Sequence, residues 1–155
     1  MPTTDPLAHA VALAARNVAG GGGPFGAVIV LPDGSAVEGV NRVTLDNDPT
    51  AHAEVVAIRA AAARLGTFDL SGCSLYSSCE PCPMCGAAAL WARLDTVVFA
   101  ADRHDAAAAG FDDSAFYALF EQPGSDWPTV LRHDPSPDRL APFEAWRDFA
   151  GRTEY

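Results

Sequence analysis

Apolar residues recur at two different spacings in the first third of the chain. Along positions 7–19 they return every three or four residues, which predicts a helix. The run Gly20–Gly23 and the following Pro24 end that helix, because both residue types interrupt regular structure. Positions 26–43 hold two apolar stretches on either side of Asp33–Gly34, a tight-turn signal. This arrangement predicts a β-hairpin.

A second helix is predicted from the residues that follow the hairpin. Asp48 is a suitable N-cap and Pro49 fits the first helical position, so the helix is expected to begin there. Gly66 provides its C-terminal stop. Helical spacing assigns the expected buried face to Val55, Ile58, Ala62 and Leu65.

Similar patterns continue to the end of the chain. Strands are predicted at 74–77 and 96–101, with a weaker one at 129–132, and helices at 86–93, 112–120 and 143–150. The resulting order, α-β-β-α-β-α-β-α, predicts an α/β fold, specifically a three-layer α-β-α sandwich. Residues 1–155 are expected to form a single domain, since domains hold roughly 100–200 residues.

Composition narrows the class of partner. The chain is 49% hydrophobic, which argues against intrinsic disorder, and its net charge is −10 with no lysine at all. A surface this acidic repels nucleic acid and anionic membranes, so a small molecule is the expected partner. No apolar run reaches the roughly 20 residues of a membrane span, and the amino terminus lacks the pattern of a secretion signal. A cytoplasmic location is therefore expected.

The candidate chemistry lies in two short segments. Cysteines in a cytoplasmic chain favour metal binding or catalysis over disulfides. A catalytic zinc site uses three nitrogen or sulfur ligands and keeps a fourth position open, and His52, Cys82 and Cys85 satisfy that count. The two cysteines share one helical turn, where the helix dipole stabilises thiolates. Glu54 can face the open position, and H-x-E followed by P-C-x-x-C is typical of zinc-dependent deaminases.

Alternatives to this zinc site exist within the same segment. Cys79 and Cys82 have the same spacing, but Pro83 can begin a helix whereas Cys79 ends a strand, which favours Cys82 with Cys85. Cys73 is interpreted as a small core residue. The alternative interpretation is a structural zinc module, in which Cys79 completes a four-ligand cage and Glu54 has no role.

The motifs also resemble a known family. His52-Ala53-Glu54 and Pro81-Cys82-Pro83-Met84-Cys85 are similar to the cytidine deaminase-like superfamily. Gly110-Phe111-Asp112-Asp113 and the terminal Glu154-Tyr155 narrow the likeness to bacterial guanine deaminases, over almost the whole chain. The resemblance implies a mixed central sheet, one Zn²⁺ per subunit and hydrolysis of guanine to xanthine and ammonia, with Glu54 carrying protons. Cytosine, nucleosides, aminotriazines and tRNA adenosine stay as alternative substrates on the same scaffold.

The resemblance further implies residues that bind the substrate. Asp113 is expected to recognise the base or shuttle a proton, although either Asp112 or Asp113 also suits the cap of the following helix. Asn41 offers a donor and an acceptor to the purine edge, and Phe25 is expected to stack on the base. A homodimer that exchanges the C-terminal arm 134–155 would place Tyr155 over the partner's pocket.

Overall fold

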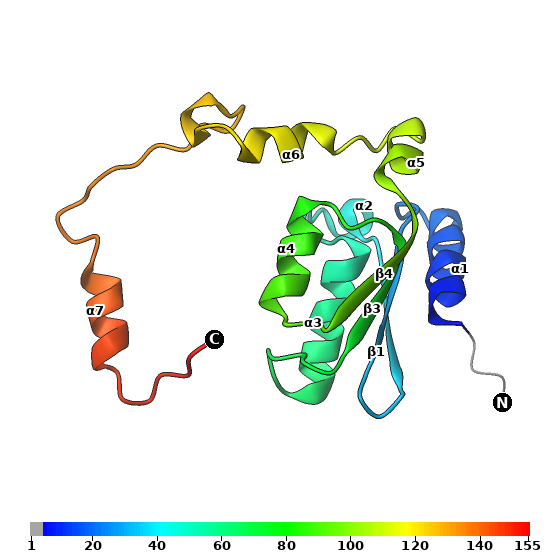
Figure 1. Ribbon diagram of the computed structural model, residues 1–155, viewed down its shortest axis with the longest axis horizontal. Helices are drawn as coiled ribbons and strands as arrows, with labels where there is room; N and C mark the ends of the chain where they lie inside the picture. The colour runs from blue at the N-terminus through cyan, green and yellow to red at the C-terminus, as the bar shows by residue number, and fades with distance from the viewer. Residues whose placement is uncertain (1–4) are drawn as a thin grey trace. The chain divides into compact units, whose positions relative to one another are not determined.

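The computed structural model describes residues 5–155 (Figure 1). The described chain divides into two compact units, of which the first ends at Ser114 and the second comprises Ala115–Tyr155. The expectation of one domain with a C-terminal arm from residue 134 stays a prediction. Among residues 5–155, no helix has the length and apolar character needed to span a membrane.

The first unit is built on a four-stranded mixed sheet with strand order β2-β1-β3-β4. Strand β1 (Gly26–Val30) pairs antiparallel with both β2 (Ala36–Val40) and β3 (Ser74–Cys79). Strand β3 pairs in parallel with β4 (Thr96–Ala101), its neighbour on the other side. The predicted hairpin and the mixed character of the sheet are therefore confirmed.

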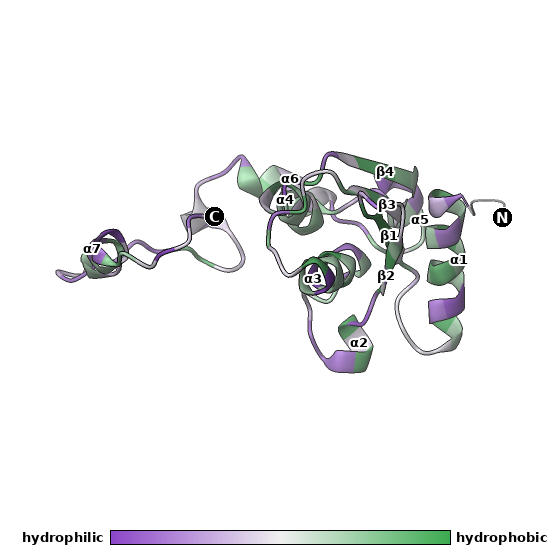
Figure 2. Cartoon of the chain, turned by 90° about the horizontal axis from the view of Figure 1, so that it is seen from below, coloured by the Kyte–Doolittle hydropathy of each residue, from purple (hydrophilic) through white to green (hydrophobic). Residues whose placement is uncertain are grey.

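Helices cover both faces of this sheet, as Figures 1 and 2 show. Helix α1 (Pro6–Ala19) lies on one face, and α3 (Ala53–Leu65) and α4 (Pro83–Trp91) lie on the other. On the α3 side the core includes Ile29, Leu70 and Leu75, all fully buried. The structure is thus the predicted three-layer α-β-α sandwich.

Close packing of α3 on the sheet depends on Gly39 in β2. A Cβ atom at Gly39 would collide with the carbonyl oxygen of Ala53 and lie 2.6 Å from the backbone nitrogen of Ala57. The helix can approach this closely because glycine has no side chain. The start of α3, which carries the first part of the candidate site, is held against β2 in this way.

The predicted start of the second helix is wrong, and its predicted buried face is only partly right, since Ile58 and Ala62 pack half-buried against the core. The helix begins at Ala53 after the N-cap His52, because Asp48 is used in a turn in which it accepts hydrogen bonds from the Thr50 backbone N–H and hydroxyl at 2.8 and 2.7 Å. The short helix α2 (Val43–Asp46) precedes that turn. The residues of α3 that are buried are Ala53, Glu54, Ala57 and Ala61, whereas Leu65 is exposed.

The other helix predictions in the first unit need small corrections. Helix α4 begins at Pro83, three residues before the predicted start, with Cys82 as its N-cap. Helix α5 (Arg103–Ala108) follows β4 through the N-cap Asp102, in a region where no helix is predicted.

The second unit contains α6 (Ser114–Phe120), the 3₁₀ helix η1 (Gly124–Asp126) and α7 (Ala141–Asp148). The strand predicted at 129–132 does not form: the backbone N–H of Leu131 donates to the carbonyl of Gly124 at 2.9 Å and closes a loop on η1. No residue of Ala115–Tyr155 is buried. This unit therefore has no core of its own.

Candidate active site

Two residues of the site come from the start of α3. His52 is the N-cap residue with extended backbone (φ −67°, ψ 153°), and Glu54 lies in the first turn. The close approach of α3 to Gly39 buries this turn, so only 6% of Glu54 is exposed. The imidazole of His52 is half-buried and lines a cavity beside the carboxylate.

Two further residues come from the start of α4, which has the same local design. Cys82 is the N-cap residue, Pro83 follows at the first helical position and Cys85 lies in the first turn. Proline suits that position because its fixed φ matches the helix and its missing N–H has no helical partner there. Both sulfurs therefore lie at a helix N-terminus, whose dipole favours the thiolate form.

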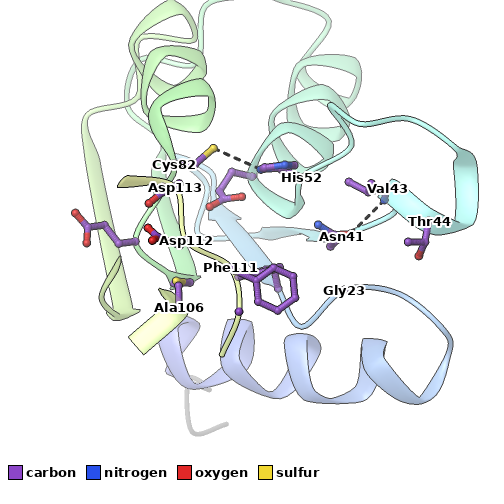
Figure 3. Close-up of a pocket in the computed structure, with 15 residues that line it drawn as sticks. Gly23, Asn41, Val43, Thr44, His52, Cys82, Ala106, Phe111, Asp112 and Asp113 are labelled. Carbon is purple, nitrogen blue, oxygen red and sulfur yellow. Dashed lines mark hydrogen bonds between the residues drawn. The ribbon is translucent and has the colours of Figure 1, made fainter. Parts of the chain in front are cut away.

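The two helix starts bring three metal-ligating side chains together. Nδ1 of His52 lies 3.5 Å from Sγ of Cys82, the contact drawn in Figure 3, and 3.4 Å from Sγ of Cys85. All three ligand atoms lie within 4.8 Å of one another. Tetrahedral zinc, with bonds of about 2.0–2.1 Å to nitrogen and 2.3 Å to sulfur, places such atoms about 3.6 Å apart. The group therefore fits a zinc ion with little rearrangement.

Cys79 and Cys73 lie outside this group. Sγ of Cys79 lies 3.9 Å from the carbonyl oxygen of Asp102, and burial raises the pKa of its thiol to about 11. Cys73 is fully buried in the core, and burial raises the pKa of its thiol. Among the described residues, the geometry thus favours the Cys82–Cys85 pair over Cys79–Cys82 and does not form a four-residue cage.

The two candidate sulfur ligands shift each other's pKa in opposite directions. The hydrogen bond from the Cys85 thiol, followed by the contact with His52, lowers the pKa of Cys82 to about 4. The pKa of Cys85 is raised, chiefly by its hydrogen bond with Cys82 and also by burial. The hydrogen bond with Cys82 raises the pKa of His52. Cys82 therefore ionises more readily than Cys85.

Glu54 is held beside these ligands but remains outside the ligand group. Its Oε1 accepts a hydrogen bond from the Ser77 hydroxyl at 3.1 Å, and its Oε2 accepts one from the Cys85 thiol at 3.4 Å. Burial raises the pKa of the Glu54 carboxyl. A carboxyl that binds protons more readily than usual, next to a metal position, can act as a general base and acid.

A cavity of about 400 Å³ opens onto these groups. His52, Glu54 and Cys82 line it together with Gly23, Phe25, Asn41, Val43, Thr44, Cys79, Glu80, Ala106, Gly110, Phe111, Asp112 and Asp113. Three of the substrate-binding residues expected from the sequence, Phe25, Asn41 and Asp113, are thus brought together. The fourth, Tyr155, belongs to the second unit.

The walls of the cavity are fixed by specific contacts. The rings of Phe25 and Phe111 meet edge to face, with centroids 5.0 Å apart and an interplanar angle of 87°. Asn41 is buried, and its Oδ1 accepts from the Val43 backbone N–H at 3.2 Å (Figure 3), which leaves the amide Nδ2 as its donor toward the cavity. Sequence reasoning assigned no role to Phe111 or Glu80, although both lie in motifs that it singled out.

The structure separates the roles of the two neighbouring aspartates. Asp112 accepts a hydrogen bond from the Ser114 backbone N–H at 2.9 Å, and the bonds from Ser114 lower the pKa of its carboxyl. Burial instead raises the pKa of Asp113, whose side chain lies near Cys82 in Figure 3. Asp112 is therefore held in a turn that leads into α6, while Asp113 lines the cavity beside it.

Comparison with known proteins agrees with this geometry. Residues 3–101 match the family model of the cytidine and deoxycytidylate deaminase zinc-binding region. The chain is 51% identical to guanine deaminase from Bacillus subtilis over 96% of both chains, and an X-ray structure of guanine deaminase from that organism superposes with a TM-score of 0.94 over 97% of this chain and 96% of that one. A structure of guanine deaminase from Nitrosomonas europaea is 36% identical in sequence and superposes with a TM-score of 0.67. The match covers 73% of this chain and 65% of that chain. A tRNA-specific adenosine deaminase from Aquifex aeolicus is 45% identical over 50% of this chain and 52% of its own.

Proposed function

Because the chain belongs to the cytidine and deoxycytidylate deaminase zinc-binding family, we propose that it hydrolyses guanine to xanthine and ammonia. One observation carries the proposal: two members of a ligand group suited to zinc, His52 and Cys82, line the same cavity as Glu54 and Asp113. The relationship to the Bacillus subtilis guanine deaminase, which extends over nearly the whole of both chains, supports guanine as the substrate.

We assign one zinc ion per subunit to His52, Cys82 and Cys85. Their spacing suits tetrahedral zinc, and three protein ligands leave one position for water. An ion held there would lower the pKa of a water molecule toward neutrality, which would prepare that water to attack C2 of guanine.

Glu54 moves the protons that this reaction requires. Its carboxylate takes a first proton from the attacking water and delivers it to the ring nitrogen. It then takes the second proton from the hydroxyl added at C2 and delivers it to the 2-amino group, which leaves as ammonia. Burial, which raises its pKa, allows the same group to accept and then release a proton. Water and guanine are thereby converted to xanthine and ammonia with no further reactant.

Three side chains orient the base for this attack. The carboxylate of Asp113 accepts from the adjacent N1–H and 2-amino group, two donors that guanine presents on one edge. The Nδ2 of Asn41 donates to an acceptor on the purine edge. Phe25, braced by its contact with Phe111, offers a ring face for stacking.

We also propose that the enzyme acts as a homodimer in which residues 134–155 pack against the partner subunit and Tyr155 closes its pocket. No residue of the second unit is buried, and Tyr155 is 74% exposed. Apolar side chains are exposed along this unit, among them Phe116, Phe120, Val130, Leu131, Leu140, Phe143 and Phe149. On the first unit, Leu90 and Trp91 of α4 are also exposed. Exposed apolar surfaces of this kind are typical of protein interfaces.

Ammonia release from a panel of substrates tests the assignment. The panel contains guanine, guanosine, cytosine, cytidine, adenine and an aminotriazine, each with and without a metal chelator. Chelator-sensitive release that is fastest with guanine supports the proposal, and a faster reaction with another compound reassigns the substrate. The net charge of −10 and the absence of lysine argue against tRNA, and strong tRNA binding at low salt would overturn that exclusion. The cytoplasmic location stays a prediction.

A further inference from the structure

Glu80 and Arg103 form a forked ion pair at the edge of the cavity. Oε1 of Glu80 accepts from Nη2 and Nε of Arg103 at 2.7 and 3.0 Å, and Oε2 accepts from the Arg103 backbone N–H at 2.8 Å. Both carboxylate oxygens are thus held by one residue. The Glu80 side chain is 18% exposed and that of Arg103 39%, so the pair is partly shielded from water. Such charge-assisted, two-point contacts fix geometry as well as adding energy.

The ion pair connects two segments that reach the cavity from different directions. Glu80 lies in the loop between β3 and α4, two residues before Cys82, and it lines the cavity itself. Arg103 is the first residue of α5, which follows β4 in Figure 1. Beyond α5 the chain continues to Phe111 and Asp113, which also line the cavity. The pair therefore joins the loop that presents a candidate metal ligand to the segment that presents the candidate base-binding side chains.

Helix α5 is weakly anchored by burial, because none of its residues, Arg103–Ala108, is fully buried. Just before the helix, the Glu80 backbone N–H donates to the carbonyl of Ala101 at 2.7 Å, so the end of β4 is already held. The capping box between Asp102 and Asp105 is internal to the turn and stabilises the helix without anchoring it to the sheet. Helices in proteins normally gain most of their stability from burying an apolar face, and α5 is at most half-buried. The side-chain contact between Arg103 and Glu80 therefore contributes to holding this helix in place.

The charges around Asp113 agree with that role. Burial raises the pKa of Asp113, the positive charge of Arg103 lowers it and the negative charge of Glu80 raises it again. Among the described residues, the cavity lining contains four carboxylates, those of Glu54, Glu80, Asp112 and Asp113, and no arginine. Arg103, placed just behind this lining, offsets part of their mutual repulsion.

We propose that Glu80 and Arg103 are positioning residues that fix α5, and with it Phe111 and Asp113, against the zinc-binding loop so that the cavity is preformed for the base. The inference rests on the proposed function for its kinetic consequence only. Neither residue contacts the reacting atoms. Loss of the pair should therefore weaken substrate binding more than it slows chemistry on bound substrate.

Kinetics of Arg103→Ala provide the first test. We expect the KM for guanine to rise about 5- to 10-fold, the loss of one charge-assisted contact, while kcat changes by less than about 2-fold. Zinc should remain at one ion per chain. Arg103→Lys keeps the positive charge but loses the two-nitrogen contact of the guanidinium with Glu80. Its KM should therefore lie between those of the wild type and Arg103→Ala. The matched control is Arg64→Ala, which removes an arginine bound to Ser35 Oγ and the Ala36 carbonyl, neither of which lines the cavity.

Amide hydrogen exchange of the zinc-loaded protein provides a second test that needs no substrate. In Arg103→Ala, exchange should become faster across residues 103–113 and stay unchanged across residues 53–65. Glu80→Gln should act in the same direction, and the double variant should be no worse than Arg103→Ala alone if the two residues act as one unit. Unchanged exchange, or an unchanged KM in an enzyme active on guanine, overturns the inference. A wild-type protein inactive on guanine refutes the proposed function instead, and exchange alone then decides whether the pair holds α5.

Discussion

The Ser77 hydroxyl donates a hydrogen bond of 3.1 Å to Oε1 of Glu54, and so links the middle of the sheet to the first turn of α3. Ser77 lies in β3, an interior strand, and is 1% exposed. The second carboxylate oxygen lies 3.4 Å from Sγ of Cys85 on α4. The sheet and both helices that carry the candidate ligands therefore determine where this carboxylate lies.

Replacement of Glu54 by glutamine tests its assignment as proton carrier. The amide oxygen of the introduced glutamine can still accept from Ser77, but the side chain cannot carry a proton. We expect turnover to fall by about 10²–10⁴-fold, the usual contribution of a general acid or base, while zinc content and fold are retained. Xanthine formation and elemental analysis on the same sample measure both. Glu38→Gln, which alters an exposed glutamate on β2, should leave turnover unchanged. Normal turnover in Glu54→Gln would remove this residue from the mechanism.

Zinc stoichiometry in three cysteine variants tests the ligand set. Cys82→Ala should lose most of its zinc, because only two protein ligands remain. Cys79→Ala should keep one ion per chain, since its sulfur faces the carbonyl of Asp102. Cys73→Ala should also keep zinc and serves as the control for loss of a buried thiol. Zinc loss in Cys79→Ala would instead support the structural cage that includes this residue.

The candidate ligands could be predicted from the sequence because each pair lies on one helical turn. His52 with Glu54, and Cys82 with Cys85, are local patterns whose geometry follows from helix periodicity. Their convergence required only that both helix starts lie at the same end of the sheet. The pairing of Glu80 with Arg103, by contrast, depends on the register of β3 against β4, in which Cys79 lies opposite Ala101. No local pattern encodes that register.

Two errors in the sequence prediction, the start of the second helix and its buried face, have identifiable physical causes. Asp48 and Pro49 are good helix-start residues, but the side chain of Asp48 closes a turn with Thr50 and the helix starts at Ala53. Leu65 was expected in the core, yet the tight contact between α3 and Gly39 selects alanines for the buried face. At Asp48 a local turn replaces the expected helix start, and at Leu65 tertiary packing overrides local preference.

A methyl group at Gly39 should disrupt the site from a distance. In Gly39→Ala the new Cβ would collide with Ala53 and push the start of α3, with His52 and Glu54, away from the sheet. Overpacking of this kind costs about 1–3 kcal/mol or more, so we expect a lower unfolding midpoint together with weaker zinc retention. Gly86→Ala in α4 is the matched control. Its Cβ would meet open space, and alanine favours a helix by about 0.5–1 kcal/mol over glycine. Equal stability of the two variants would contradict this account of α3 packing.

Acid should destabilise the protein partly through its turn aspartates. Hydrogen bonds from Ser35 lower the pKa of Asp33, and those from Ser71 lower the pKa of Asp69, both from an ordinary value of 3.8. A carboxyl whose pKa is lower in the folded state stabilises the fold at pH values above its unfolded pKa of 3.8. That stabilisation is lost as pH falls from 3.8 through the pKa that the carboxyl has in the folded state.

The double variant Asp33→Asn/Asp69→Asn isolates this contribution. It should be less stable than the parent in urea near neutral pH, and the difference should shrink toward zero as pH falls below 3.8 and through the lower pKa values of the folded state. Because both proteins bind zinc alike, acid-induced zinc loss affects them equally and cancels in the comparison. A difference between the two proteins that stays constant from neutral pH to strongly acid pH would show that these charges do not act on stability.

Removal of Gly151–Tyr155 tests whether the C-terminal arm completes a pocket. We expect the truncated protein to keep its zinc, since the candidate ligands lie in the first unit, and to lose most of its turnover.

Complementation distinguishes exchange between subunits from closure within one chain. In a mixed dimer of truncated and Glu54→Gln chains, the intact arm of the Glu54→Gln chain would reach the pocket of the truncated chain, whose Glu54 is present. Exchange therefore predicts that co-expressed, doubly tagged mixed dimers regain activity that neither homodimer has. Inactive mixed dimers would contradict exchange, and full activity of the truncated protein alone would show that the arm has no role in turnover.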